Sequence, residues 1–148
     1  MNGEVPVPRS GGGGGHRALP HTADVRIEAW GDSREQCLGE AVLALVESFA
    51  DVSAAHADAV RRVRLEEVGD DDLLADLLDE VVFRVDEFGE VPVDVEVETT
   101  DDGLDVRLAV AALRGVPITG AVPSAVSWHV LRMGPGPHGW SCAVAVDV

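Results

Sequence analysis

Hydrophobic residues in the first third of the chain follow two different spacings. Residues 25–29 alternate between apolar and charged, the period of two that is typical of a strand with one buried face. Shortly afterwards, Ser33 and Gln36 have the spacing of a capping box, which predicts the start of a helix. The residues that follow carry apolar side chains at intervals of three and four, as one face of an amphipathic helix requires: Leu38, Ala41, Val42, Leu45, Val46 and Phe49.

A second helix is predicted after a short strand that contains Val63 and Leu65. Its apolar positions repeat along one face and are Leu73, Leu74, Leu77, Leu78, Val81, Val82 and Val85. The acidic triplet Asp70-Asp71-Asp72 precedes them, and negative charge is favourable at the positive end of a helix dipole. We therefore interpret the triplet as a solvated helix N-terminus and not as a metal-binding cluster.

The second half of the chain has the alternating pattern of strands. Residues 91–97 and 104–110 flank Asp101-Asp102-Gly103, a tight hairpin signal. A second hairpin is predicted over residues 126–148, turning across the Gly-Pro-rich segment 134–139. Early helices followed by a run of strands favour the α+β class. We predict a single two-layer domain in which two helices pack on one mainly antiparallel sheet.

The N-terminal segment lacks this periodicity. Residues 1–19 contain five consecutive glycines, 11–15, whose chain entropy disfavours an ordered conformation. A phosphate-binding loop needs a preceding strand, a following helix and a nearby Lys, and none of these is predicted here. We therefore predict a flexible leader over 1–19 and a folded domain over 20–148.

The charge balance limits the classes of partner. The chain has 27 acidic and 11 basic residues, for a net charge of −16, and every basic residue is Arg. Proteins that bind nucleic acid tightly need clustered cations. The nearest cluster, Arg61-Arg62-Val63-Arg64, precedes Glu66-Glu67 and is interpreted as a solvated stretch of strand or loop. Direct tight binding of nucleic acid is not expected, whereas a cation or a basic partner protein suits this surface.

The cysteines and the hydropathy pattern predict a cytoplasmic protein. Cys37 and Cys142 lie far apart in the sequence and have no CxxC partner. No secretory signal is recognised at the N-terminus, and no apolar stretch reaches the roughly 20 residues that cross a membrane. We expect both thiols to be reduced and buried.

Candidate chemistry is confined to a few oxygen ligands. No motif for nucleophilic or phosphoryl-transfer catalysis is present, and the histidines lack metal-ligand spacing. Asp24 stands at the start of the first predicted strand and Asp147-Val148 at the end of the last one. If these strand ends met, their oxygens would suit a hard cation such as Ca²⁺ or Mg²⁺. The sequence pattern alone does not bring them together.

Several segments resemble the archease family. His21-Thr22-Ala23-Asp24-Val25 is similar to the HTAD-[IV] motif that begins archeases, and Asp147-Val148 is similar to their C-terminal D-[IV]. The segment 125–129 is similar to the family's A-[IV]-T-[YF]-H, and Asp72-Leu73-Leu74 to the start of its second helix. The resemblance covers residues 20–148.

The resemblance implies a function. In archeases a divalent cation, Ca²⁺ or alternatively Mg²⁺ or Mn²⁺, lies between the positions that here are Asp24, Asp147 and Val148. The family assists RtcB-type RNA ligases in tRNA splicing and RNA repair, by promoting guanylylation and turnover of the ligase. The resemblance therefore implies an accessory protein that is not itself an enzyme, with Ser124 and His129 as possible contacts to the partner. His21 is interpreted as a structural residue.

Two departures from the family pattern leave alternatives open. Ser124 stands where the family has Lys, and the loop 114–120 lacks the carboxylates that the family carries there. These changes favour an alternative in which the chain is a divergent interaction module without a ligase-activating role. A third interpretation, a hydrolase that uses Cys37 or His129, lacks a base placed beside the nucleophile.

Overall fold

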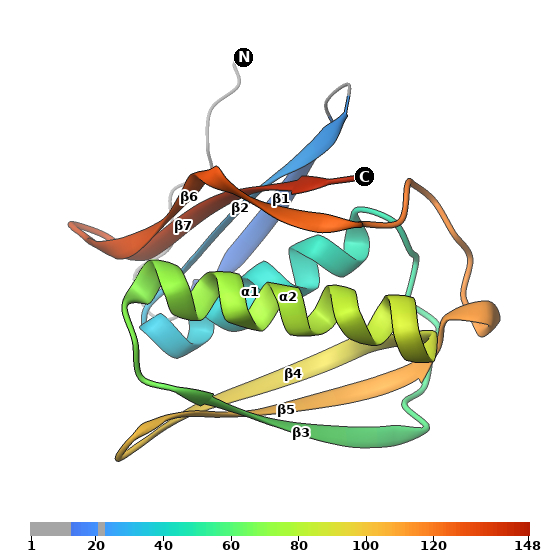
Figure 1. Ribbon diagram of the computed structural model, residues 1–148, viewed down its shortest axis with the longest axis horizontal. Helices are drawn as coiled ribbons and strands as arrows, with labels where there is room; N and C mark the ends of the chain where they lie inside the picture. Colours follow the sequence, from blue (N-terminus) through green and yellow to red (C-terminus); the bar gives the residue numbers. More distant parts are fainter. Residues whose placement is uncertain (1–12, 21–22) are drawn as a thin grey trace.

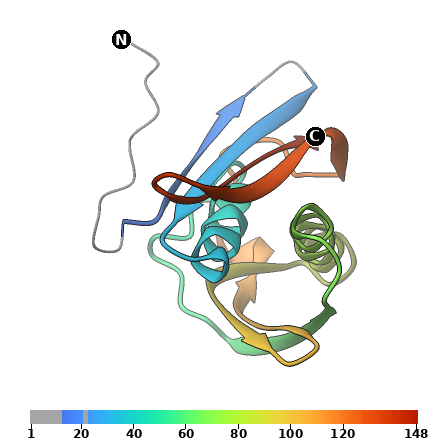
Figure 2. The ribbon, with the colours of Figure 1, turned by 90° about the vertical axis from the view of Figure 1, so that its left-hand side faces the viewer.

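Two antiparallel sheets enclose a layer of two helices in the computed structural model of the protein (Figure 1). The structure describes residues 13–20 and 23–148, except for the side chains of Trp128 and His129. The first sheet has the strand order β1-β2-β7-β6 and the second the order β3-β5-β4. Figure 2, turned by 90°, shows the same three layers edge-on.

The elements follow the predicted order with one additional strand at the start. The first sheet consists of β1 (Gly15–Pro20), β2 (Asp24–Gly31), β6 (Ala125–Gly136) and β7 (Gly139–Asp147). The second sheet consists of β3 (Ala59–Glu66), β4 (Glu90–Thr100) and β5 (Gly103–Ala112). The helices are α1 (Arg34–Glu47), α2 (Asp70–Phe88) and a single 3-10 turn, η1 (Leu113–Gly115).

Local sequence signals define both helices. Ser33 is the N-cap of α1, and its hydroxyl accepts a hydrogen bond from the Gln36 N–H at 3.0 Å. The Gln36 side chain accepts from the Asp32 N–H at 2.7 Å, one residue earlier than in a standard capping box. Helix α2 begins with three aspartates and ends at Gly89, whose φ of +61° is a left-handed conformation that favours glycine. All predicted apolar positions of both helices are buried.

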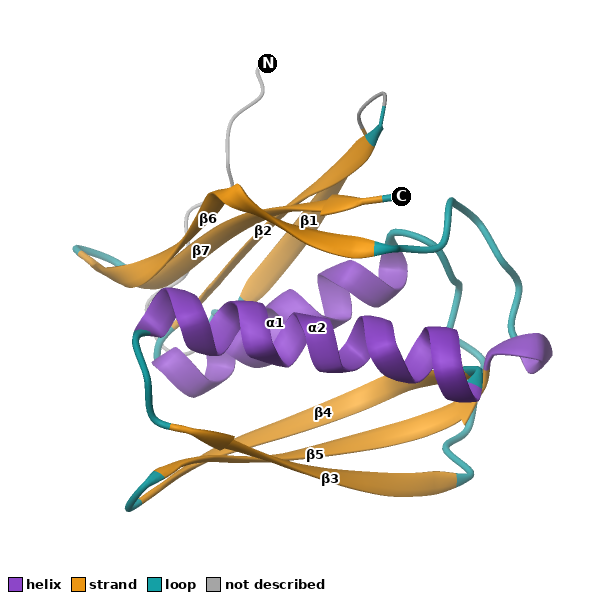
Figure 3. Cartoon of the chain, viewed as in Figure 1, coloured by secondary structure: helices purple, strands orange, loops and turns teal. Residues whose placement is uncertain are grey.

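The predicted α+β class, with two helices packed on antiparallel strands, is confirmed. The strands are divided between two sheets, so the domain has three layers where two were predicted, as Figure 3 shows by element type. Helix α1 packs on both sheets, against β2 above and β4 below. Periodicity predicts which face of a strand is buried, but not which sheet the strand joins, because both sheets bury their apolar faces against the same helices.

Strand β1 corrects the predicted leader. Residues 1–12 lie outside the described part of the chain, so the prediction is untested there, but Gly15–Leu19 pair with β2 and were wrongly assigned to a flexible segment. Gly15 lies under the indole of Trp30, and a Cβ atom at this position would lie 2.8 Å from that ring. The glycine therefore permits close packing at this point.

The second hairpin also differs from the prediction. Its strands continue through the Gly-Pro-rich segment, so β6 ends at Gly136, β7 begins at Gly139, and only Pro137-His138 form the turn. Gly139 has a φ of +114°, and a Cβ atom there would lie 2.5 Å from the carbonyl oxygen of Gly31. Both the conformation and the contact require glycine.

The arginine cluster lies on the exposed strand β3, as predicted, and two of its three arginines form ion pairs. Arg61 donates to Glu90 at 2.6 Å, and Arg62 donates to both oxygens of Asp105 at 2.7–3.2 Å. The Arg62 guanidinium lowers the pKa of Asp105 below its ordinary value. No helix among the described residues is long and apolar enough to cross a membrane.

Two ion contacts of a single histidine, His16, fasten β1 to α1. Nδ1 of His16 lies 2.6 Å from Oε1 of Glu40, and Nε2 lies 2.8 Å from Oε1 of Glu47. These carboxylates, Glu40 foremost, raise the pKa of His16 from 6.5 to about 9, against the opposing effect of partial burial. The imidazolium is therefore the folded-state form at neutral pH.

We expect the contribution of His16 to stability to depend on pH. Because its pKa is raised on folding, the stabilisation is fully present below pH 6.5 and is lost as the pH rises through about 9. His16→Gln should lower the free energy of unfolding by about 1–2 kcal/mol near pH 6, a value reduced by the exposure of Glu47. Urea unfolding near pH 6 and near pH 10 measures this difference, with the turn variant His138→Gln as control. An equal loss at both values would contradict the assignment.

Candidate metal centre

The central strand pair of the first sheet brings the two predicted metal ligands together. Strand β7 pairs antiparallel with β2, and the register places Asp24 opposite Asp147. The two strand ends lie side by side near the end marked C in Figure 1. The sequence pattern alone did not bring these two residues together, and the register of the two strands does.

Both carboxylates project from the same face of the sheet. Val25 and Ile27 are buried toward the helices, so Asp24 projects from the outer face, which is turned away from them. Directly opposed residues of an antiparallel pair share a face and have Cβ atoms about 4.5–5.5 Å apart. Asp24 is half-buried, and its Oδ1 atom is shielded from solvent, whereas Asp147 is exposed. Two carboxylates are thus held side by side at the partly buried ends of β2 and β7.

Main-chain hydrogen bonds fix the backbone around this pair. The Val148 N–H donates to the carbonyl of Ala23 at 3.3 Å. On the other side of β7, the Ser124 N–H donates to the carbonyl of Asp147 at 2.7 Å, and the Ser124 hydroxyl lies 3.2 Å from the same oxygen. The end of β7 is therefore held between Ala23 and Ser124, the residue that precedes β6.

The donor set fits a hard divalent cation. Asp24 and Asp147 offer carboxylate oxygens from opposed positions, and Val148 offers main-chain oxygens beside them. Among the described residues there is no group of three His, Cys, Asp or Glu side chains that could hold a metal ion. A cation here would therefore depend on two side chains, main-chain oxygens and water, a mixture that Ca²⁺ and Mg²⁺ accept and that Zn²⁺ in structural sites does not.

Of the other residues considered in the sequence, one lies beside the carboxylate pair. Ser124, predicted as a partner contact, adjoins Asp147 directly. His129 lies on β6 in the stretch where the register against β7 shifts, between Ser127 and Arg132. His21 lies outside the described residues.

Arg26 is a charged neighbour of the site that the sequence interpretation did not single out. It follows Asp24 by two residues on the same face of β2 and is exposed. Within the described ranges it forms no ion pair, unlike Arg17, which pairs with Glu28 on the adjacent strand. The alternation along residues 24–28 contained this information, because every second residue of a strand shares a face.

The two cysteines are unsuited to nucleophilic chemistry. Both thiols are free and buried, as predicted, and the Cys37 thiol donates to the carbonyl of Ala29 at 3.6 Å. A hydrogen bond with Cys142, together with burial, raises the pKa of Cys37 well above its ordinary value. A thiol that remains protonated in the core is a poor nucleophile, so this geometry does not support the hydrolase interpretation for Cys37.

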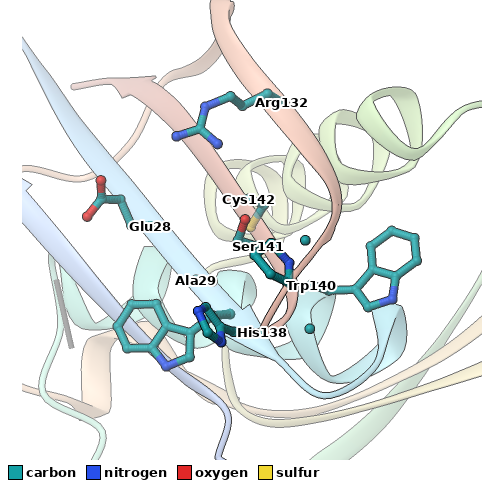
Figure 4. Close-up of a pocket in the computed structure, with 11 residues that line it drawn as sticks. Glu28, Ala29, Arg132, His138, Trp140, Ser141 and Cys142 are labelled. Carbon is teal, nitrogen blue, oxygen red and sulfur yellow. The ribbon is translucent and has the colours of Figure 1, made fainter. Parts of the chain in front are cut away.

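A separate pocket of about 260 Å³ lies at the hairpin end of the same sheet. In Figure 4, Arg132 and Glu28 lie toward one end of this pocket and His138 toward the other. Glu28 is four residues from Asp24 along β2, which separates the two sites by about 13 Å. The pocket is therefore distinct from the carboxylate pair.

The fold and this site define an α+β domain with a pair of opposed aspartates at the ends of two central strands. The comparisons with known proteins identify the family. The model of the Archease protein family (MTH1598/TM1083) matches residues 16–148. The probable protein archease of Mycobacterium tuberculosis (strain ATCC 25618 / H37Rv) is 47% identical over 144 residues, which cover 97% of this chain and 80% of that protein. The chain therefore belongs to the archease family.

Solved structures agree with this assignment. The solution structure of protein 1598 of Methanobacterium thermoautotrophicum superposes with a TM-score of 0.73 at 27% identity, covering 90% of this chain and 99% of that one. The crystal structure of an archease, described as a possible chaperone, from Thermotoga maritima has a TM-score of 0.63 at 19% identity, covering 88% and 94%. The second likeness shows the fold alone.

In the absence of a cation, we expect the opposed carboxylates to destabilise the fold. Like charges directly opposite each other in a strand pair are unfavourable, so Asp147→Asn in the presence of a chelator should raise the free energy of unfolding by about 0.2–1 kcal/mol. The gain should shrink at high salt. Glu66→Gln is a suitable control, because Glu66 is exposed and lies opposite Gly103. A loss of stability in Asp147→Asn would contradict this view of the pair.

Proposed function

We propose that this member of the archease family binds a divalent cation, Ca²⁺ or alternatively Mg²⁺ or Mn²⁺, through Asp24, Asp147 and Val148. We further propose that it activates an RtcB-type RNA ligase, by promoting its guanylylation and turnover in tRNA splicing or RNA repair. The observation that carries the proposal is the register of β2 and β7, which opposes Asp24 to Asp147. Membership in the family supports the extension to the ligase.

The chain's own residues define what such a site can do. Asp24 and Asp147 hold their oxygens on the outer face of the sheet, and the hydrogen bond from Val148 to Ala23 keeps the strand end in register. A bound cation would neutralise the two carboxylates and polarise oxygen ligands, including those of a partner. Since Asp147 is exposed, a group from another protein can approach the site from solvent.

The charge of the chain supports a role as an accessory protein. A net charge of −16 opposes direct binding of RNA and favours association with a partner that has a basic surface. We place the protein in the cytoplasm, because the free thiols of Cys37 and Cys142 are expected in a reducing compartment. In this proposal the ligase carries out the chemistry and this chain is not an enzyme.

A second candidate function is a divergent interaction module that keeps the fold without activating a ligase. Ser124 is the observation that favours it, since it stands where the resemblance implies Lys and it contacts Asp147 through hydrogen bonds. The positively charged side chain that the resemblance implies beside the proposed metal centre is thus replaced by a neutral one. The loop 114–120, which lacks carboxylates, is the second departure.

Metal binding should be visible as thermal stabilisation. A ligand bound only by the folded state at 100 times its dissociation constant adds about 2.7 kcal/mol, which for this length corresponds to about 5–10 °C. We expect Ca²⁺ or Mg²⁺ to raise the thermal midpoint of the wild type, and Asp24→Asn or Asp147→Asn to abolish the rise. A tag fused after Val148 should reduce it, and Glu66→Gln should not. An undiminished response in both aspartate variants would exclude this metal site.

The ligase proposal is tested by guanylylation rates. If a Lys at position 124 contacts the ligase or its nucleotide, Ser124→Lys should activate a ligase adapted to a Lys-bearing archease about ten- to hundredfold better than the wild type does. With the ligase of the same organism, the wild type should activate and Asp24→Asn should not. If the wild type fails with that ligase and Ser124→Lys does not restore activation, the interaction module is the better description.

A further inference from the structure

Two of the three phenylalanines of this aromatic-poor chain lie on the surface and touch each other. Phe49 is fully buried, but Phe83 is 49% exposed and Phe88 is 59% exposed, both on α2. Their rings pack edge to face with centroids 5.6 Å apart. Large apolar side chains that cluster on a surface mark a site of interaction, whereas isolated ones do not.

The phenylalanine pair borders an apolar groove. A hollow of about 610 Å³ lies between the C-terminal end of α2 and the segment 113–122, with Phe88 in its wall. Ile118 and Val122 line it and are themselves 51% and 41% exposed. Four of the exposed large hydrophobic residues of the described chain are thus gathered in one place: Phe83, Phe88, Ile118 and Val122.

Main-chain hydrogen bonds fix the loop that borders the groove. The Leu113 N–H donates to the carbonyl of Gly89 at 2.8 Å and fastens the start of the loop to the end of α2. The Thr119 N–H donates to Phe49 at 2.8 Å, and the Asp51 N–H donates to Pro117 at 2.9 Å. A preformed surface of this kind loses little conformational entropy when it is covered.

The exposed charges on α2 beside this apolar surface are negative, whereas the wall of the groove also holds Arg61, which pairs with Glu90, and Arg114. The outward face of α2, which no other element covers in Figures 1 and 2, carries Asp72, Asp76, Asp79, Asp86 and Glu87. Within the described ranges these carboxylates form no ion pair. Three acidic residues of the second sheet differ, since Glu90, Glu96 and Asp105 pair with arginines.

We infer that the exposed face of α2 from Asp76 to Phe88 and the adjoining groove form a docking surface for a basic segment of a partner protein that carries an apolar side chain. The apolar side chain would enter the groove beside Phe88, and its flanking Lys or Arg residues would face Asp76, Asp79 and Glu87. In identifying this partner with the ligase, the inference rests on the proposed function.

The negative charge of the docking surface favours a basic polypeptide over a second copy of the chain or a nucleic acid. A second copy of the chain would bring a net charge of −16 against another −16, and the acidic faces of α2 would oppose each other. A nucleic acid would meet the same repulsion. A basic polypeptide relieves the repulsion among neighbouring carboxylates on the helix, since like charges spaced by three or four residues are unfavourable.

The phenylalanine pair lies in a different layer from the metal centre, while Val122 in the wall of the groove is two residues from Ser124. Asp24 and Asp147 lie on the outer face of the first sheet, whereas Phe83 and Phe88 belong to the helical layer. Variants of one surface should therefore leave the other intact. This separation allows binding to a partner and activation of that partner to be measured independently.

The test is a guanylylation assay with the ligase of the same organism, in which the concentration of this protein is varied. It yields the concentration needed for half-maximal activation and the maximal activation at the plateau. Phe83→Ser with Phe88→Ser should raise the concentration needed for half-maximal activation at least tenfold and leave the plateau unchanged. Asp24→Asn should lower the plateau instead. Asp76→Asn with Asp79→Asn should also raise the half-maximal concentration and weaken its dependence on salt. Val60→Ser, at 61% exposure on β3, and Glu96→Gln with Glu98→Gln, on β4, are the matched controls.

A binding measurement without the ligase separates this inference from the proposed function. The probe is a synthetic helical peptide of Lys and Leu, compared with one of Glu and Leu, and the readout is the change in amide NMR shifts. Shifts centred on 79–90 and 113–122 with the Lys peptide, lost in Phe83→Ser with Phe88→Ser, support the docking surface even if no ligase is activated. Shifts centred elsewhere, equal shifts with the Glu peptide, or unchanged activation by the phenylalanine variants overturn it. So does a wild-type dimer in solution that those variants dissociate.

Discussion

The pairing of β2 with β7 is the constraint on which the rest of the molecule depends. It joins an early strand to the last one across more than a hundred residues of sequence, and it forms the centre of the first sheet. A slip of one residue would turn Val144 and Val146 toward solvent, so burial of these side chains against α1 and α2 specifies the register strongly. The same register opposes Asp24 to Asp147. The geometry of the candidate metal centre is therefore a consequence of how the core is packed.

The three-layer arrangement explains where the surface can be used for binding. Helices enclosed by two sheets bury most of their circumference, which accounts for the continuous apolar run of residues 41–46 in α1. Helix α2 lies at the open side of this layer and keeps one face in solvent. The outer face of the second sheet, in contrast, is covered with paired charges such as Arg62 and Asp105. Exposed apolar residues and unpaired carboxylates thus coincide on α2, away from the carboxylate pair.

The excess of negative charge has different effects at different places. At Asp24 and Asp147 it creates a local repulsion that a cation can neutralise. On α2 it favours the positively charged partner that we propose, and around His16 it holds an imidazolium that fastens β1 to α1. Because the pKa of His16 is raised by Glu40 and Glu47, this contact persists at neutral pH. The acidic composition is therefore part of both the stability and the binding properties of the domain.

The sequence by itself determined the two helices, six of the seven strands and the buried face of each helix, because caps, hairpin signals and hydrophobic periods act over a few residues. The candidate metal ligands came from short motifs that resemble those of the family, and their role stays a prediction. The prediction of a flexible segment was wrong at Gly15–Leu19, which overlap and follow the glycine run but pair with β2. The sequence also did not single out Arg26, the exposed α2 surface or the contact of Ser124 with Asp147. Only the tertiary structure decided how the strands are divided between two sheets and that Asp24 meets Asp147. These features depend on pairings between distant segments, whose energies come from burial against a shared core and leave no periodic signal in the chain.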